Sequence, residues 1–325
     1  MSVLVSINCI TYNHEEYIAD AIEGFLSQKT DFEYEILIGE DCSTDNTKRI
    51  VEQYIAKYPE LIKLVTSEEN VGAAKNADRI LELSKGKYIA ICEGDDYWTD
   101  PYKLQKQVGY LEKNPRCTMC FHEADIVKVP KKSTGMKIKP YKRDQVSPME
   151  DIIIGGGGFC PTASLVYPKS VMQDFPDYLR TSHVGDYPLQ LLLTSSGYAY
   201  YMNECMSAYR VGVKGSWTTR LNSSSDLKER MMVVNEGDIQ ILTAFNRYTN
   251  FKYNDSVERV IHEKRYAIYI GSGITNEPKN NRYEEHVKSL SIKRKAKLIA
   301  FNSFPKSYGM LAQMKNYFLN IKLFN

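Results

Sequence analysis

The chain is short of cysteine, proline, glycine and net charge, and it has no long apolar run. Its 325 residues include 7 Cys, 12 Pro and 19 Gly, and the formal net charge is +2. The scarcity of these three residue types excludes the disulfide-scaffold and collagen-like classes. A hydrophobic fraction of 43% excludes an intrinsically disordered chain. Without a run of about 18 apolar residues, no segment is expected to span a bilayer.

The N-terminus lacks the marks of a secretory signal peptide. The opening segment MSVLVSINCITYNHEE has no basic region and turns polar after Ile10. An odd number of cysteines favours reduced thiols over a disulfide framework. We therefore expect a cytoplasmic protein.

Basic residues are spread unevenly along the chain. Residues 286–325 contain eight Lys or Arg and no Asp or Glu, and residues 128–143 contain seven and none. Apolar side chains are interleaved with the basic ones in 286–325, a combination that suits the headgroup region of an anionic membrane. The alternatives are a solvated face or a helix packed on the rest of the protein. No nucleic-acid partner is expected.

Apolar runs alternate with helical patterns in the first third of the chain. Strands are predicted at 3–10, 35–39, 61–66 and 87–92, and helices at 14–28, 44–58, 72–83 and 101–114. This alternation predicts an α/β fold with a parallel sheet and helices on both faces. Further strands are predicted at 118–129, 163–167 and 198–210, a loop or hairpin at 128–143, a helix at 183–195, and mostly helices after 226.

The segment Glu93-Gly94-Asp95-Asp96 is the strongest candidate for a functional site. It follows a predicted buried strand directly, and ligands of parallel sheets bind beyond the carboxyl ends of the strands. Adjacent carboxylates repel each other unless a cation neutralises them, and hard oxygen ligands suit Mg²⁺ or Mn²⁺ beside a diphosphate. The alternative is an acidic turn that caps the next helix.

Two other strand ends carry polar residues. Residues 39–45 include Asp41, which could bind a base or ribose, while Ser43 and Asp45 could cap the following helix. Residues 70–76 include Gly72 for a tight turn and Lys75, which could reach a phosphate or could simply be solvated.

Several other motifs carry weaker predictions. The four glycines at 155–158 have neither the spacing nor the position of a dinucleotide-binding motif, so they could admit a bulky ligand or form a flexible loop. Cys117 and Cys120 lack the second ligand pair that a zinc site needs. No histidine stands in a hydrolase motif. Asp186, just before an apolar helix, could be no more than a helix cap.

In their order and spacing, these segments resemble glycosyltransferase family 2. The resemblance covers residues 1–217, about two thirds of the chain. Its motifs are similar to the family's first strand and nucleotide loop (5–13), "DDGSTD" (40–45), "NxGxxxxxN" (70–76), "DxDD" (93–96), "ED" (185–186) and "YRxHxxS" (209–217). Gly185 replaces the first acid of "ED". Gly212 stands near the expected histidine, so Arg210 or Lys214 would have to take over its contact with the metal or diphosphate.

The resemblance implies the GT-A fold, with a single mixed, mainly parallel sheet and flanking helices. It also implies a catalytic domain over 1–220, divided into a nucleotide-binding half (1–115) and an acceptor-binding half (116–220). A mostly helical extension follows at 221–325. The implied activity is the metal-dependent, inverting transfer of a sugar from a nucleotide sugar, expected to carry UDP. The implied acceptor is a glycan or lipid-linked hydroxyl in bacterial surface polysaccharide synthesis.

The resemblance also assigns roles to residues. Asp186 would be the catalytic base, and Asp95 and Asp96 would hold Mg²⁺ or Mn²⁺. The expected donor contacts are Thr11, Tyr12, Asn13, Asp41, Asn70, Lys75, Glu93 and Asp95. The expected acceptor contacts are Trp98, Gly157, Gly158 and Phe159. The alternatives are a nucleotidyltransferase, whose basic glycine-rich loop is missing after the first strand, and a non-catalytic glycan-binding protein on the same fold.

Overall fold

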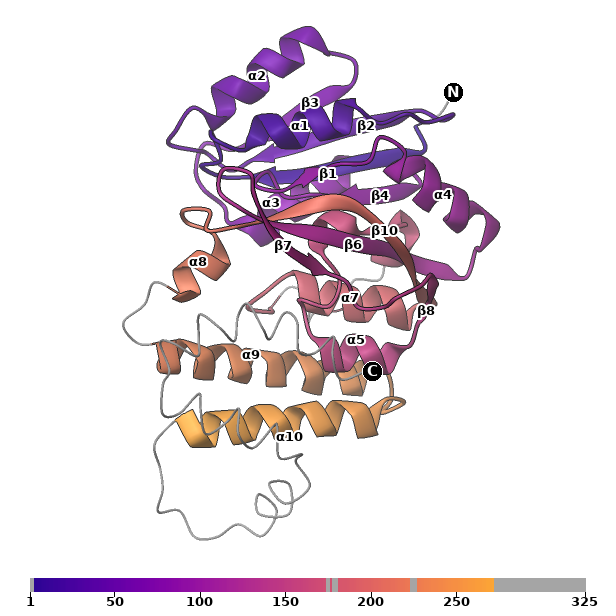
Figure 1. Ribbon diagram of the computed structural model, residues 1–325, viewed down its shortest axis with the longest axis vertical. Coiled ribbons are helices and arrows are strands. Elements are labelled where there is room, and N and C mark those ends of the chain that lie inside the picture. The colour runs from indigo at the N-terminus through magenta and orange to yellow at the C-terminus, as the bar shows by residue number, and fades with distance from the viewer. Residues whose placement is uncertain (1–2, 174–175, 177–180, 223–226, 272–325) are drawn as a thin grey trace.

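The computed structural model describes residues 3–173, 176, 181–222 and 227–271 (Figure 1). Within these residues ten strands form one sheet, in the order β3-β2-β1-β4-β9-β6-β10-β5, with β7 paired to β6 and β8 paired to β10. The mixed sheet with flanking helices confirms the predicted fold class. The basic segment 286–325 lies outside the described residues.

The first half of the chain forms the parallel part of the sheet. Strand β1 pairs in parallel with β2 and with β4, and β2 pairs in parallel with β3. Their carboxyl ends therefore share one edge of the sheet. The elements are β1 (Val5–Thr11), α1 (Ile18–Leu26), β2 (Tyr34–Glu40), α2 (Thr47–Lys57), β3 (Ile62–Thr66), α3 (Ala73–Leu83), β4 (Tyr88–Ile91) and α4 (Lys103–Lys113).

The second half adds a mixed part. Strand β9 (Val166–Pro168) pairs antiparallel with β4, and the long strands β6 (Cys117–Lys128) and β10 (Tyr198–Val211) run parallel to each other. The short strands are β5 (Tyr97–Trp98), β7 (Lys132–Ile138) and β8 (Gln145–Ser147). The basic stretch 128–143, predicted as a loop or hairpin, contains the turn and the second strand, β7, of a hairpin with β6.

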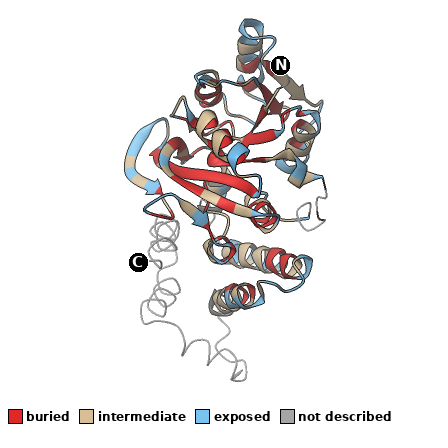
Figure 2. Cartoon of the chain, turned by 90° about the vertical axis from the view of Figure 1, so that its right-hand side faces the viewer, coloured by how far each residue is buried: buried red, intermediate tan, exposed pale blue. Residues whose placement is uncertain are grey.

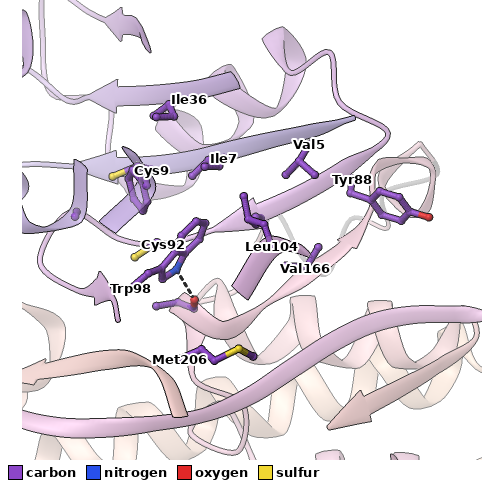
Figure 3. Packing of buried hydrophobic residues seen from close by; sticks show 14 of the residues in the cluster. Val5, Ile7, Cys9, Ile36, Tyr88, Cys92, Trp98, Leu104, Val166 and Met206 are labelled. Carbon is purple, nitrogen blue, oxygen red and sulfur yellow. Dashed lines mark hydrogen bonds between the residues drawn. The ribbon is translucent and has the colours of Figure 1, made fainter. Parts of the chain in front are cut away.

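Two hydrophobic cores lie on opposite faces of this sheet. Alternate residues of a strand point to opposite sides, so Phe121 of β6 joins one core while Cys120 joins the other. One core packs against α1 and α4, and Figure 3 shows part of it around Trp98. The other packs against α5 (Met149–Gly155) and α7 (Asp186–Ser195). Figure 2 shows the central strands buried along most of their length.

Helices α9 (Leu227–Tyr248) and α10 (Asn254–Gly271) lie beyond α5 and α7 (Figure 1). Their residues Leu242, Phe245 and Val257 belong to the same hydrophobic cluster as Leu191 of α7. A short helix, α8 (Trp217–Asn222), precedes them. None of the helices in the described ranges is both long and apolar enough to cross a membrane.

The structure differs from the predicted elements in several places, and the short elements β5, β8 and α8 were not predicted. Helix α1 begins at Ile18 rather than at residue 14, because turns occupy the chain before it and Asn13 has a φ of 54°. Helix α5 was not expected. The strand predicted at 163–167 is shorter and later, since a 3-10 turn at Thr162–Ser164 precedes β9.

Candidate active site

The turn after β4 brings the 93–96 carboxylates to the edge of the sheet. Gly94 N–H donates to the carbonyl of Ile10 at 2.9 Å, and Asp96 N–H donates to the carbonyl of Glu93 at 3.0 Å. A Cβ atom at Gly94 would lie 2.6 Å from Thr11 Oγ1. The turn is therefore packed directly against the end of β1, and only glycine fits at its second position.

Carboxylates from two distant parts of the chain converge here. Burial, together with the charges of Asp95 and Asp186, raises the pKa of Glu93 to about 8. Burial, followed by the charges of Asp95 and Glu93, raises the pKa of Asp96 well above its ordinary value. Asp186 comes from the start of α7, more than 90 residues along the chain. The fold thus places the charges of Asp95 and Asp186 where both act on Glu93, and the roles of these residues remain predictions.

Asp186 sits in a confined position. Its Oδ1 accepts a hydrogen bond from the N–H of Tyr187 at 2.7 Å, but burial outweighs this bond and raises the pKa of Asp186. A raised pKa makes a carboxylate a stronger proton acceptor. The geometry therefore allows a general base at this point.

The glycine loop lies against Asp186. A Cβ atom at Gly157 would lie 3.0 Å from both carboxylate oxygens of Asp186. Gln190 of α7 holds this loop by donating to the carbonyls of Gly157 at 2.9 Å and Cys160 at 3.2 Å. The absence of a side chain at 157 leaves room beside the carboxylate, so Gly157 remains a candidate acceptor contact.

Arg210 of β10 supports the acidic turn at 93–96 from the interior of the protein. Its side chain is fully buried and lies between the rings of Tyr17 and Tyr97, with Cζ 5.0 and 4.7 Å from their centroids. The guanidinium donates to the carbonyl of Asp95, to that of Pro130 at 2.8 Å, and to the carboxylate of Asp20. The guanidinium is therefore occupied by bonds within the protein and does not replace the missing histidine as a diphosphate contact. Lys214 is exposed.

Sequence reasoning did not single out His14, which lies beside the acidic turn. Its Nε2 is 3.9 Å from Asp95 Oδ2, and its Nδ1 is 3.2 Å from Thr11 Oγ1. The backbone N–H of His14 donates to Thr47 Oγ1 at 2.8 Å, which ties the loop after β1 to the start of α2. The sequence signal that could have identified His14 was its position directly after the predicted nucleotide loop, 5–13.

Asp41 supports the turn that carries Asn70. Its two carboxylate oxygens accept the N–H groups of Val71 at 2.8 Å and Gly72 at 2.9 Å. The side-chain amide of Asn70 donates to the carbonyl of Asp41 at 3.1 Å. Asp41 is nearly buried. These bonds bring the loops after β2 and β3 together, and the donor contact of Asp41 remains a prediction.

The remaining predicted donor contacts occupy different environments. Asn13 bridges the first two loops, because its Oδ1 accepts the N–H of Thr44 at 2.8 Å. Thr11 is buried, whereas Tyr12 and Lys75 are exposed. The donor roles of these residues remain predictions.

Two predicted acceptor contacts need correction. The Trp98 side chain is buried in the core, packs edge-on against Phe25 and donates from Nε1 to the carbonyl of Ala163 at 2.8 Å (Figure 3). Phe159 is also a core residue, packed against Tyr141. Strand alternation turns Trp98 inward, so neither ring presents a surface to a sugar. Gly157 and Gly158 remain candidates.

The carboxylate cluster fits a divalent cation that is shared with a substrate. Among the described residues, no group of three or more His, Cys, Asp or Glu side chains is placed to hold a metal ion. Mg²⁺ often takes only one or two carboxylates and completes its shell with substrate phosphates and water. Asp95 retains 15% side-chain exposure, and the like charges that raise the pKa of Glu93 and Asp96 favour a neutralising cation.

All seven cysteines are free thiols, including the Cys117 and Cys120 pair. This confirms the expectation of unpaired cysteines. Burial raises the pKa of both Cys117 and Cys120, so they are inert apolar side chains of β6.

Comparison with known sequences points to one family. Residues 6–164 match the model described as glycosyl transferase family 2. The chain is 36% identical over 214 residues to the uncharacterized protein Rv1520 of Mycobacterium tuberculosis, covering 66% of this chain and 60% of that protein. It is 32% identical over 210 residues to TuaG of Bacillus subtilis, whose name assigns it to teichuronic acid biosynthesis as a glycosyltransferase. That match covers 64% of this chain and 79% of TuaG.

Solved structures share the fold. TarS of S. aureus in complex with UDP-GlcNAc superposes with a TM-score of 0.55 at 16% identity, covering 99% of this chain and 91% of TarS. The mannosyltransferase PcManGT of Pyrobaculum calidifontis, in complex with GDP-Man and Mn²⁺, has a TM-score of 0.55 at 13% identity and 88% coverage of its chain. This chain spans 60% of the length of its mycobacterial relatives.

Proposed function

The chain belongs to glycosyltransferase family 2, and from that premise we propose that it transfers a sugar from a nucleotide sugar to an acceptor hydroxyl, with inversion. The observation that carries this proposal is the convergence of Glu93, Asp95 and Asp186 at the edge where β1 and β4 end. A donor diphosphate would lie on the Asp95 side of this cluster, and an acceptor hydroxyl would lie next to Asp186.

Each part of the site has a role in this reaction. Asp186 takes the proton from the acceptor hydroxyl as that oxygen attacks the anomeric carbon, while the bond to the diphosphate breaks. Arg210 keeps the Asp95–Asp96 turn in place through its backbone and side-chain bonds. Asp95 and Asp96 would hold Mg²⁺ or Mn²⁺, which, when bound, stabilises the charge on the departing diphosphate.

We propose UDP as the nucleotide and a glycan or lipid-linked saccharide as the acceptor. The fold neighbour TarS has been solved with UDP and with UDP-GlcNAc, and the name of TuaG refers to teichuronic acid biosynthesis. An active site on the cytoplasmic side of a membrane would suit such an acceptor. Residues 286–325 would supply the basic surface, and cosedimentation of the full chain with anionic vesicles at low salt tests this location.

A donor screen tests the proposed reaction. The full chain is incubated with individual UDP-, GDP- and dTDP-sugars and Mn²⁺, and its melting temperature is measured. A ligand at about 100 times its Kd stabilises the folded state by about 2.7 kcal/mol, which gives a clear shift. The donors that shift the melting temperature are then assayed for nucleoside diphosphate release with candidate acceptors. If no nucleotide sugar stabilises the protein and none is turned over, the proposal is wrong.

A further inference from the structure

Helix α9 contacts the segment that leads into Asp186. His183 lies three residues before Asp186, and its Nε2 is 3.4 Å from Oδ1 of Asp238 on α9. The other oxygen of Asp238 binds the ammonium group of Lys264 on α10. The side chains of His183, Asp238 and Lys264 are only 23%, 16% and 21% exposed. Asp238 of α9 therefore links the segment before Asp186 to Lys264 of α10.

Gly237 supplies a second, independent observation. A Cβ atom at this position would lie 2.3 Å from Nδ1 and 2.6 Å from Cε1 of His183. The imidazole ring thus rests on the bare backbone of α9. A glycine inside a helix costs about 0.5–1 kcal/mol relative to alanine. At position 237, the missing side chain leaves the space that the His183 ring occupies.

Apolar side chains also connect α9 with α7. Tyr187 and Leu191 of α7 share a cluster with Ile241 and Phe245 of α9. Helix α9 therefore packs on the same core as α7, and it contacts the segment before the first residue of α7 through His183. Asp186 is that first residue, and the charges of Asp238 and His183 also act on its pKa, which Asp238 raises and His183 lowers.

We propose that Gly237 and Asp238 are positioning residues, which fix the segment 183–186 through His183 and thereby aim the Asp186 carboxylate at the acceptor hydroxyl. The inference rests on the role proposed above for Asp186. It extends the functional unit well beyond residues 6–164, the part that matches the family model. On this account, α9 and α10 contribute to the function of the acceptor side.

Gly237→Ala separates this role from simple stabilisation. The substitution favours the helix by its propensity but displaces the His183 ring. Gly109→Ala in α4 is the matched control, because a Cβ atom there meets no other atom within 4 Å. Both variants should melt at or above the wild-type temperature. Only Gly237→Ala should lower kcat, by about 10- to 100-fold, since a displacement of about 1 Å can cost that much. The donor KM should stay unchanged.

Hydrogen exchange provides a readout that does not need turnover. Peptides covering residues 181–190 should exchange faster in Gly237→Ala and in Asp238→Asn than in the wild type or in Gly109→Ala. Wild-type kcat together with wild-type exchange in both variants would overturn the inference, as would faster exchange with unchanged kcat. If the wild-type protein transfers no sugar, the proposed reaction is at fault. The exchange data then still decide whether α9 holds the segment, and unchanged exchange overturns the inference.

Discussion

The backbone N–H of Arg210 donates to Oδ1 of Asp96 at 2.7 Å, while the guanidinium of the same residue donates to the carbonyl of Asp95. One residue of β10 therefore binds both members of the acidic pair, across more than 110 positions of sequence. The guanidinium also pairs with Asp20 of α1. This clamp joins the nucleotide side of the sheet to its last long strand.

Replacing Arg210 with alanine should destabilise the protein strongly. The change removes one donor from Asp20, which keeps Lys131 at 2.6 Å, and removes the guanidinium donor from the carbonyls of Asp95 and Pro130. A buried acceptor left without its donor costs about 1–3 kcal/mol. Urea denaturation measures the loss. Lys214→Ala, at an exposed neighbour, should stay within about 0.5 kcal/mol of the wild type. An Arg210→Ala variant as stable as Lys214→Ala would show that the clamp has no energetic role.

Asp95→Asn should separate stability from ligand binding. It removes one of the charges that raise the pKa of Glu93 and Asp96, so the variant in EDTA should melt at or above the wild-type temperature. The increase in melting temperature caused by Mn²⁺ and the donor should disappear.

The control for Asp95→Asn is Asp31→Asn, at an exposed carboxylate in the loop before β2. It should keep the ligand-dependent shift. If Asp95→Asn also keeps a full Mn²⁺-dependent shift with the donor, Asp95 is not a metal ligand.

Lys103 should make stability depend on pH. Its side chain is fully buried, with Nζ 4.1 Å from the centre of the Trp98 ring and without a hydrogen-bond acceptor among the described residues. Burial lowers the pKa of Lys103 from 10.5 to about 7, against the opposing influence of Cys92 and Cys120. Between these values the unfolded chain binds more protons than the folded one, so the free energy of unfolding rises with pH through that window.

Urea denaturation at several pH values between about 6 and 10 tests this dependence. One linked proton gives a slope of about 1.4 kcal/mol per pH unit. Lys103→Met should be more stable than the wild type near neutral pH, and the difference should shrink as the pH approaches 10. A difference that stays constant across the range would contradict the lowered pKa.

The sequence contained enough information to predict the parallel half of the sheet. Strands β1 to β4 are short segments rich in apolar residues, and the polar residues that follow them mark the site edge. Helix α5 escaped prediction because Ile152, Ile153 and Ile154 form an unbroken apolar run within a seven-residue helix, too short to show helical periodicity.

The parts of the site that could not be predicted depend on long-range packing. Trp98 follows the acidic turn and looks like a surface residue in the sequence, yet β5 pairs with β10 and places the ring in the core. The buried position of the Arg210 guanidinium depends on its bond to Asp20, which lies 190 positions away in the sequence. The contact between His183 and Gly237 joins two segments that show no shared pattern in the sequence.

The central claim is that Asp186 is the base of a sugar transfer, and steady-state kinetics of Asp186→Asn test it most directly. The amide keeps the shape of the side chain but cannot accept the proton. Glu150→Gln, at an exposed carboxylate of α5, is the control. General-base catalysis contributes about 10²–10⁴ in rate, so kcat should fall by that factor in Asp186→Asn alone, with donor affinity and melting temperature near wild type. Wild-type transfer by Asp186→Asn, or unfolding of that variant, would contradict the account.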